Sequence, residues 1–162
     1  SKIELQEHIR PTHEIDLVEL IDYVIKTYEK ILSKNKIKLI FNKIDNCKII
    51  GDRDKLIEIF TNLIDNSIKY SDKNKEIIIT AKKDEDLIII SVADQGIGIP
   101  KESIHRITER FFTVDPSKSR SVGGTGLGLA IVKHLVSQHR AEMDINSIEN
   151  QGTTIDIKFN SL

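Results

Sequence analysis

A long segment without helical or strand periodicity interrupts the second half of this 162-residue chain. It runs from Gln95 to Gly124 and holds four of the eight glycines and two of the three prolines. Structureless loops longer than about 12–15 residues are uncommon in compact domains, and most of them are lids or binding loops. The rest of the chain is therefore expected to form a scaffold over which this segment closes.

The segments around the loop have clear periodicities. Apolar residues recur at helical spacing from Ile15 to about Ser33, from about Asp52 to Tyr70, and from Leu127 to Gln138. This order of elements favours an α/β (α+β) two-layer sandwich, in which about three helices pack on one face of a mixed, mostly antiparallel sheet. β-branched runs predict the strands of this sheet at residues 37–41, 47–50, 76–82, 87–93, 143–147 and 154–159.

Composition narrows the class of protein. The net charge of −1 removes the electrostatic attraction that non-specific nucleic-acid or membrane binders use. The single cysteine, Cys47, excludes a disulfide framework and a cysteine-based metal cage. No apolar run approaches the roughly 20 residues of a membrane span. We therefore expect a cytoplasmic domain that contacts neither nucleic acid nor membrane.

The second predicted helix carries a polar stripe. Asn62, Asn66 and Lys69 lie at i, i+4 and i+7, with Tyr70 beside them. Asparagine is a poor helix former, so two of them one turn apart favour a ligand site over the alternative of a solvated face. Amide oxygens can ligate a hard cation such as Mg²⁺, and the Lys69 ammonium suits phosphate.

A carboxylate and two glycines follow the predicted strand at residues 87–93. Asp94 precedes Gly96 and Gly98, which places an acceptor beside a backbone that a flat ligand can approach closely. An ordinary turn would look similar, so this segment alone is weak evidence.

A glycine-rich loop opens directly into the third predicted helix. Residues 123–131 read Gly-Gly-Thr-Gly-Leu-Gly-Leu-Ala-Ile, and exposed N–H groups at such a junction bind anions. The loop is not a Walker A motif, because Leu129 stands where lysine is required. Ile131 replaces the third glycine of a dinucleotide fingerprint, which excludes that motif as well.

Four segments in series resemble the conserved boxes of sensor histidine kinases. Residues 62–70 resemble the N box, 94–98 the G1 box, 109–112 the F box and 124–128 the G2 box. Each is modest alone, but their shared order and spacing are specific. The resemblance implies a Bergerat-type ATP-binding domain of the GHKL superfamily, with a lid at about 95–124. Residues 15–162 would form this domain, and 1–14 the tail of a dimerisation helix and a linker.

The resemblance also assigns roles at the base and metal ends of the nucleotide. Asp94 would accept a hydrogen bond from the adenine amino group, and Tyr70 and Ile99 would enclose the base. Asn66 would be the principal Mg²⁺ ligand, with Asn62 assisting.

Further assigned residues surround the phosphates. Lys69 would contact phosphate, the G2 backbone would cradle it, and cations of the lid would reach the γ-phosphate. Together with the two glycines of the G1 box, the lid cations and the G2 residues that the resemblance assigns to the nucleotide are Gly96, Gly98, Arg110, Lys118, Arg120, Gly124, Thr125, Gly126, Leu127 and Gly128. We expect Asn62, Asn66, Lys69 and Arg110 to be catalytic.

The chain departs from the family pattern at three places. Thr108 stands where the F box usually has an aromatic residue, and Thr113 where a basic residue often follows. Both changes leave open which lid cation reaches the γ-phosphate. Arg140-Ala141 replaces a glycine pair that is usual after the last helix, which is expected to alter only that turn.

The reaction class follows from one position. GHKL ATPases carry a water-activating glutamate where this chain has Asn62, and an amide cannot act as a general base at neutral pH. Glu58, one turn earlier, is expected to be solvated. We therefore expect transfer of the γ-phosphoryl group of Mg-ATP to a protein rather than efficient hydrolysis. The alternatives are a GHKL serine kinase of the anti-sigma type and a nucleotide-binding module without transfer activity.

The phosphoacceptor is expected to lie on another domain. Neither His8 nor His13 has the neighbours of an H box. The resemblance then implies a monomeric catalytic fragment of a homodimeric, membrane-anchored sensor. Its partners would be a dimerisation and phosphoacceptor domain and, indirectly, a response regulator.

Overall fold

The computed structural model of the chain describes residues 11, 13–72, 74–114, 116–117 and 126–162. Its helices and strands follow the predicted order over most of this length. The elements are β1 (His13–Asp16), α2 (Leu17–Thr27), α3 (Glu29–Lys34), β2 (Lys38–Asn42), β3 (Lys48–Gly51), α4 (Arg53–Lys69), β4 (Glu76–Asp84), β5 (Leu87–Asp94), the 3₁₀ helix η1 (Lys101–Arg106), α6 (Gly128–Gln138), β6 (Glu142–Ile148) and β7 (Gly152–Asn160).

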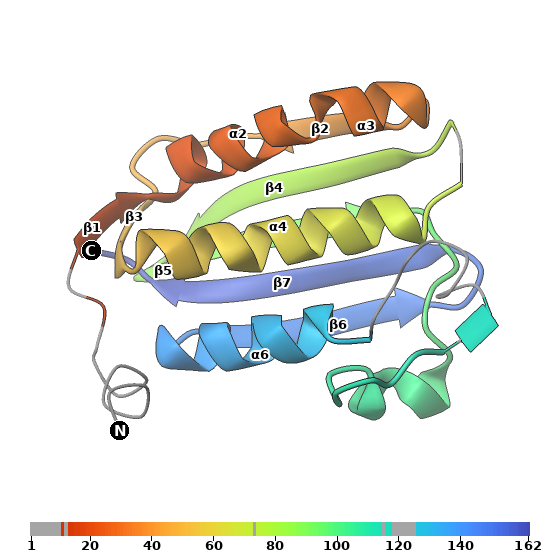
Figure 1. Cartoon of the computed structure of the whole chain (residues 1–162). Helices are drawn as coiled ribbons and strands as arrows, with labels where there is room; N and C mark the ends of the chain where they lie inside the picture. Colours follow the sequence, from red (N-terminus) through yellow and green to blue (C-terminus); the bar gives the residue numbers. More distant parts are fainter. Residues whose placement is uncertain (1–10, 12, 73, 115, 118–125) are drawn as a thin grey trace.

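A five-stranded mixed sheet forms one layer of the molecule. Its strand order is β2-β4-β5-β7-β6, and helices α2, α4 and α6 lie over one of its faces (Figure 1). β4 and β5 form the predicted hairpin, with Ile79 opposite Val92. β2 pairs with β4 in parallel, which the crossover through β3 and α4 permits. The predicted two-layer sandwich with a mostly antiparallel sheet is confirmed.

The N-terminal region differs from the prediction. The helix begins at Leu17 rather than Ile15, because the Asp16 carboxylate accepts hydrogen bonds from the first-turn N–H groups of Val18 and Glu19. His13 and Glu14, expected in a linker, belong to β1, which pairs antiparallel with β3 in a separate two-stranded sheet. The domain boundary at residue 14 stays a prediction, since residues 1–10 and 12 lie outside the described part.

Tyr28 divides the single predicted helix into α2 and α3. It ends the first helix and precedes the second, with φ −103° and ψ 1°. Leu32 of α3 is buried in the same core as Leu20 and Val24 of α2, so the apolar residues keep a helical spacing across the break. Periodicity therefore could not reveal the break.

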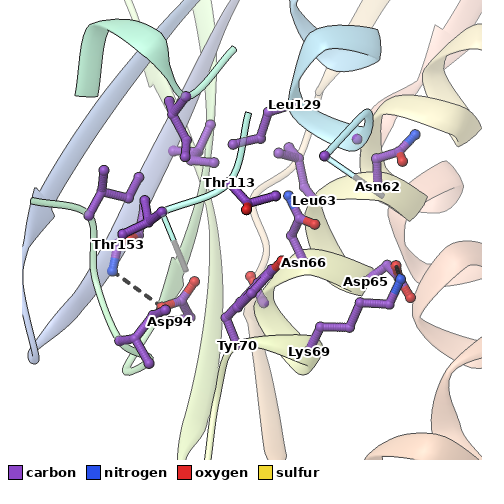
Figure 2. Close-up of a pocket in the computed structure, with 18 of the residues that line it drawn as sticks. Asn62, Leu63, Asp65, Asn66, Lys69, Tyr70, Asp94, Thr113, Leu129 and Thr153 are labelled. Carbon is purple, nitrogen blue, oxygen red and sulfur yellow. Dashed lines mark hydrogen bonds and ion pairs between the residues drawn. The ribbon is translucent and has the colours of Figure 1, made fainter. Parts of the chain in front are cut away.

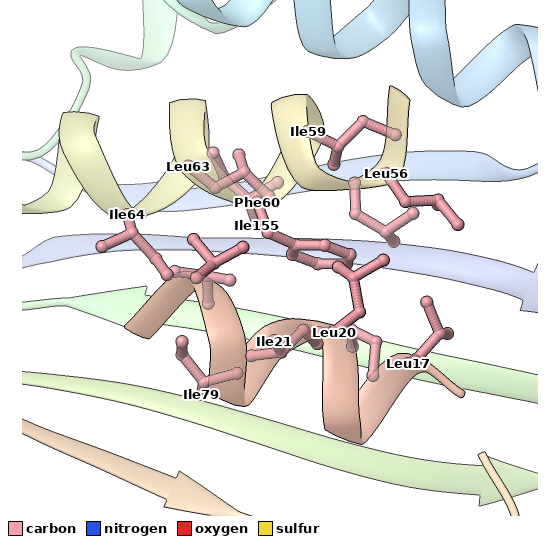
Figure 3. Close-up of a cluster of buried hydrophobic side chains, with 14 of the residues drawn as sticks. Leu17, Leu20, Ile21, Leu56, Ile59, Phe60, Leu63, Ile64, Ile79 and Ile155 are labelled. Atoms are coloured by element: carbon pink, nitrogen blue, oxygen red, sulfur yellow. The ribbon is translucent and has the colours of Figure 1, made fainter. Parts of the chain in front are cut away.

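Helix α4 is the central helix of the molecule. Its N-cap is Asp52, as predicted, and the Asp52 carboxylate accepts from the Lys55 N–H at 3.2 Å. Figure 3 shows its apolar side chains packed between α2 and the sheet. Burying each such side chain contributes about 1.5–3 kcal/mol. The buried residues of α4 are Leu56, Ile59, Phe60, Leu63, Ile64, Ser67 and Ile68.

The long segment after β5 has more structure than expected. The 3₁₀ helix η1 follows Pro100 and lies near β6. Residue 115 and residues 118–125 lie outside the described part, so a lid at 95–124 stays a prediction. Among the described residues, no helix has both the length and the apolar character that crossing a membrane requires.

Candidate functional site

A cavity of about 280 Å³ lies between α4, the N-terminal end of α6 and the C-terminal end of β5 (Figure 2). This volume is close to the lower end of small-molecule sites, which is about 300 Å³. The cavity brings together most of the described residues that the sequence predicted for nucleotide binding. Those that line it are Asn62, Asn66, Lys69, Tyr70, Asp94, Gly98, Ile99, Gly126, Leu127 and Gly128.

Asp94 is held by donors from three parts of the chain. Its Oδ1 atom accepts hydrogen bonds from the main-chain N–H groups of Gly96, at 2.9 Å, and Thr153, at 3.2 Å. The Ser67 hydroxyl donates to the same carboxylate. Burial raises the pKa of Asp94 above its ordinary value, and the three hydrogen bonds offset part of that rise. The site thus presents a fixed acceptor at one end of the cavity.

The glycines after Asp94 permit a close approach between the loop and α4. A Cβ on Gly96 would overlap the carbonyl oxygen of Tyr70. Gly98 has φ +69°, and a Cβ there would overlap the carbonyl oxygen of Ile148. The Ile97 N–H donates to the Tyr70 carbonyl at 3.3 Å, which ties the end of α4 to the loop that carries Asp94.

The two asparagines of α4 meet at the start of α6. The Nδ2 group of Asn62 donates to the Glu58 carbonyl at 2.8 Å, which leaves its Oδ1 atom to face Gly128. The position that a Cβ of Gly128 would take lies 3.3 Å from Asn62 Oδ1 and 3.5 Å from Asn66 Oδ1. Both amide oxygens therefore approach one point beside the helix end.

The start of α6 has the character of an anion site. Its N-cap residue, Leu127, contributes no side-chain hydrogen bond to the first-turn N–H groups. The positive end of the helix dipole reinforces these donors. Gly126, with φ +75°, accepts a hydrogen bond from the Phe111 N–H at 2.9 Å, which joins the predicted F and G2 boxes.

Lys69 lies at the cavity but is paired with a carboxylate. Its Nζ atom is 2.8 Å from Asp65 Oδ2. Asp65 also lines the cavity, and sequence reasoning gave it no role.

Some predicted residues are not brought to the cavity. Arg110 is exposed and is not among the lining residues, so its catalytic role stays a prediction. Gly96 supports Asp94 without lining the cavity. Lys118, Arg120, Gly124 and Thr125 lie outside the described residues. Glu58 is exposed, as expected.

Several contributors were missed by sequence reasoning. Ser67 follows Asn66 on α4 and is only 4% exposed, which is unusual for serine and marks its contact with Asp94. Thr153 comes from β7, and no local pattern links it to Asp94. The missed residues that line the cavity are Leu63, Asp65, Ser67, Val92, Ile97, Ile107, Phe112, Thr113, Val114, Leu129, Ile131, Thr153 and Ile155.

Known proteins resemble this chain in sequence and in fold. The sequence matches the family described as histidine kinase-, DNA gyrase B- and HSP90-like ATPase over residues 51–161. The chain belongs to this family. Within it, sensor histidine kinase WalK of Bacillus subtilis is 35% identical over 158 residues, or 96% of this chain and 26% of WalK. Phosphate regulon sensor protein PhoR of Pseudomonas aeruginosa is 43% identical over 109 residues, or 67% of this chain and 25% of PhoR. The chain thus spans about a quarter of these curated relatives.

Solved structures of this ATPase family extend the likeness to the N-terminal elements. The nucleotide-free catalytic domain of histidine kinase ThkA superposes with a TM-score of 0.80 at 27% identity, covering 92% of this chain and 95% of that domain. The mycobacterial sensor histidine kinase MprB gives 0.77 at 27% identity, covering 93% of this chain and 97% of that one. The resemblance to histidine kinase catalytic domains is confirmed.

Proposed function

We propose that this chain binds Mg-ATP in the cavity and transfers its γ-phosphoryl group to a histidine on a separate dimerisation and phosphoacceptor domain. The observation that carries the proposal is the convergence of the Asn62 and Asn66 amide oxygens on the start of α6, with Asp94 across the cavity. One end can hold metal and phosphate, and the other can accept a hydrogen bond from a base. Membership of an ATPase family supports ATP as the ligand.

The base end uses Asp94 as acceptor. Its Oδ1 atom is occupied by two N–H groups, which orients the carboxylate for an adenine amino group. Tyr70 and buried Ile99 supply apolar walls for the ring. These residues bind and orient the nucleotide and take no part in bond breaking.

The phosphate end fits a magnesium ion by its chemistry. Asn62 and Asn66 offer neutral oxygen ligands, which Mg²⁺ combines with waters and phosphate oxygens. Within the described part, no group of three or more His, Cys, Asp or Glu side chains is placed to hold a metal, so the amides are the candidate ligands. Bound magnesium would neutralise charge on the phosphates. The first-turn N–H groups of α6 would hold the phosphate oxygens.

Transfer is favoured over hydrolysis by the residue at position 62. The Asn62 amide donates its N–H to the Glu58 carbonyl and offers only a weakly basic oxygen to the cavity. Exposed Glu58 is not among the residues that line the cavity. The position from which GHKL ATPases activate water thus holds an amide, whereas a histidine of another domain brings its own nucleophile.

The proposed partners of this chain are inferred from a complex of a related histidine kinase. Histidine kinase ThkA, 26% identical with a TM-score of 0.77, has been solved in complex with the response regulator TrrA. By this likeness, the phosphohistidine made by the present chain would pass its phosphoryl group to a response regulator. We further propose that this catalytic part works as a monomer within a homodimeric, membrane-anchored parent.

Isothermal titration calorimetry tests the nucleotide site. We expect Asn66→Asp to bind ATP with Mg²⁺ at least tenfold more weakly than the wild type, about 1.4 kcal/mol, because a carboxylate would repel the phosphates. Asn146→Asp adds the same charge on exposed β6, outside the cavity lining, and should bind normally. Unchanged affinity in Asn66→Asp would refute the assigned pocket.

A further inference from the structure

The ion pair between Lys69 and Asp65 lies at the wall of the cavity. The two atoms Lys69 Nζ and Asp65 Oδ2 are 2.8 Å apart, and the side chains are 29% and 36% exposed. Figure 2 shows Lys69 extended along α4 toward Asp65 and away from Asp94. The ammonium that sequence reasoning assigned to phosphate thus faces a carboxylate in this structure.

A third residue, from outside α4, lies near this pair. The Tyr28 hydroxyl donates to the Thr61 carbonyl oxygen at 3.4 Å and lies near the Asp65 carboxylate. Tyr28 is the residue at which the N-terminal helix breaks into α2 and α3. Burial and the nearby Asp65 raise the pKa of Tyr28 to about 12, so its hydroxyl keeps its proton at any physiological pH.

An i,i+4 ion pair on a solvated helix contributes little and constrains neither partner. The present pair differs in two respects. The Tyr28 hydroxyl, from the junction of α2 and α3, lies near the carboxylate. Both charged residues also line the cavity, so any anion bound there interacts with both.

We propose that Asp65 is a specificity-determining residue that competes with the nucleotide phosphates for Lys69 and thereby limits the affinity for polyphosphate. The inference rests on the proposed nucleotide site. Asp65 acts by drawing the Lys69 ammonium toward itself and by placing its own negative charge beside the phosphates. Both effects grow with the charge of the ligand and vanish for an uncharged nucleoside.

The test compares adenosine, ADP and ATP, each with Mg²⁺, by calorimetry on the full chain. We expect Asp65→Asn to bind ATP about two- to fivefold more tightly than the wild type, ADP by a smaller factor, and adenosine equally. Asp22→Asn removes an equal charge from the exposed pair with Lys43 and should change nothing.

A double-mutant comparison separates competition for Lys69 from a general structural effect. In a Lys69→Met background, the gain from Asp65→Asn should shrink. An equal gain in both backgrounds, an equal gain for adenosine, or no gain at all would overturn the inference while leaving the nucleotide site intact. A wild-type chain that binds neither ADP nor ATP would instead overturn the proposed function, and this inference with it.

Discussion

The burial of Asp94 is expected to reduce stability in exchange for ligand binding. Burial raises the pKa of its carboxyl, so the folded chain holds the proton more tightly than the unfolded chain does. The free energy of unfolding therefore falls as the pH rises from the ordinary value of 3.8 through the raised pKa. A carboxylate kept in such a place is expected where a ligand makes use of it.

We expect Asp94→Asn to be at least as stable as the wild type at pH 7 and to bind ATP at least tenfold more weakly, about 1.4 kcal/mol. The amide oxygen still accepts from Gly96 and Thr153, but the amide nitrogen is a donor that opposes the adenine amino group. Thermal unfolding between pH 4 and pH 7, with calorimetry, measures both effects. A variant that is less stable at pH 7 yet binds ATP normally would contradict this account of Asp94.

Among single residues, the sequence predicted those that belong to local motifs and missed those whose contacts depend on the packing of distant segments. Asn62, Asn66 and Asp94 were found because each stands out within its own segment. Ser67 and Thr153 were missed because their contact with Asp94 depends on how α4 and β7 sit against β5. Asp65 was missed because its i,i+4 spacing to Lys69 is typical of a solvated helix face.

Among the elements, α4 and α6 are joined by a buried histidine. His139 Nε2 accepts from the Asp52 N–H at 3.0 Å, so Nδ1 carries the proton and donates to the Leu135 carbonyl at 2.8 Å. Only a neutral imidazole can make both bonds. Burial lowers the pKa of His139, while Asp52 opposes and Lys55 adds to this effect. The free energy of unfolding should therefore fall as the pH drops below the ordinary value of 6.5.

We expect His139→Gln to lose about 1–3 kcal/mol of unfolding free energy at pH 7, because a buried hydrogen-bonded link is broken. The variant should also lose part of the stability change between pH 7 and pH 5.5, which denaturant titrations at both pH values measure. His134→Gln, exposed on the same helix, is the matched control and should keep the wild-type change. Parallel pH dependences for the wild type and His139→Gln would rule out this role.

Helices and strands were predicted correctly where a pattern within one segment defines them. The hairpin of β4 and β5 and helix α4 with its Asp52 cap follow directly from their sequences. The pairing of β3 with β1, rather than within the large sheet, could not be read from the chain, because it joins residues more than thirty positions apart. The helix break at Tyr28 was also missed, because the apolar residues of α3 pack into the same core as those of α2.

For the whole molecule, the site lies where the two layers meet, at the end of α4, the start of α6 and the end of β5 (Figure 1). The central core lies between α2, α4 and the sheet (Figure 3). Ligand contacts can therefore change without loss of the fold. In the proposed function, the site binds the nucleotide and positions its phosphates, and the acceptor comes from another domain.

The most direct test mixes this chain with the dimerisation and phosphoacceptor domain of its parent kinase and γ-labelled ATP with Mg²⁺. We expect label on the acceptor domain that is stable to alkali and lost in acid, as phosphohistidine is. Replacing the acceptor histidine by glutamine should abolish the label. Acid-stable phosphoserine, or no label on an acceptor mixed with a chain that demonstrably binds ATP, would contradict the claim of histidine kinase activity.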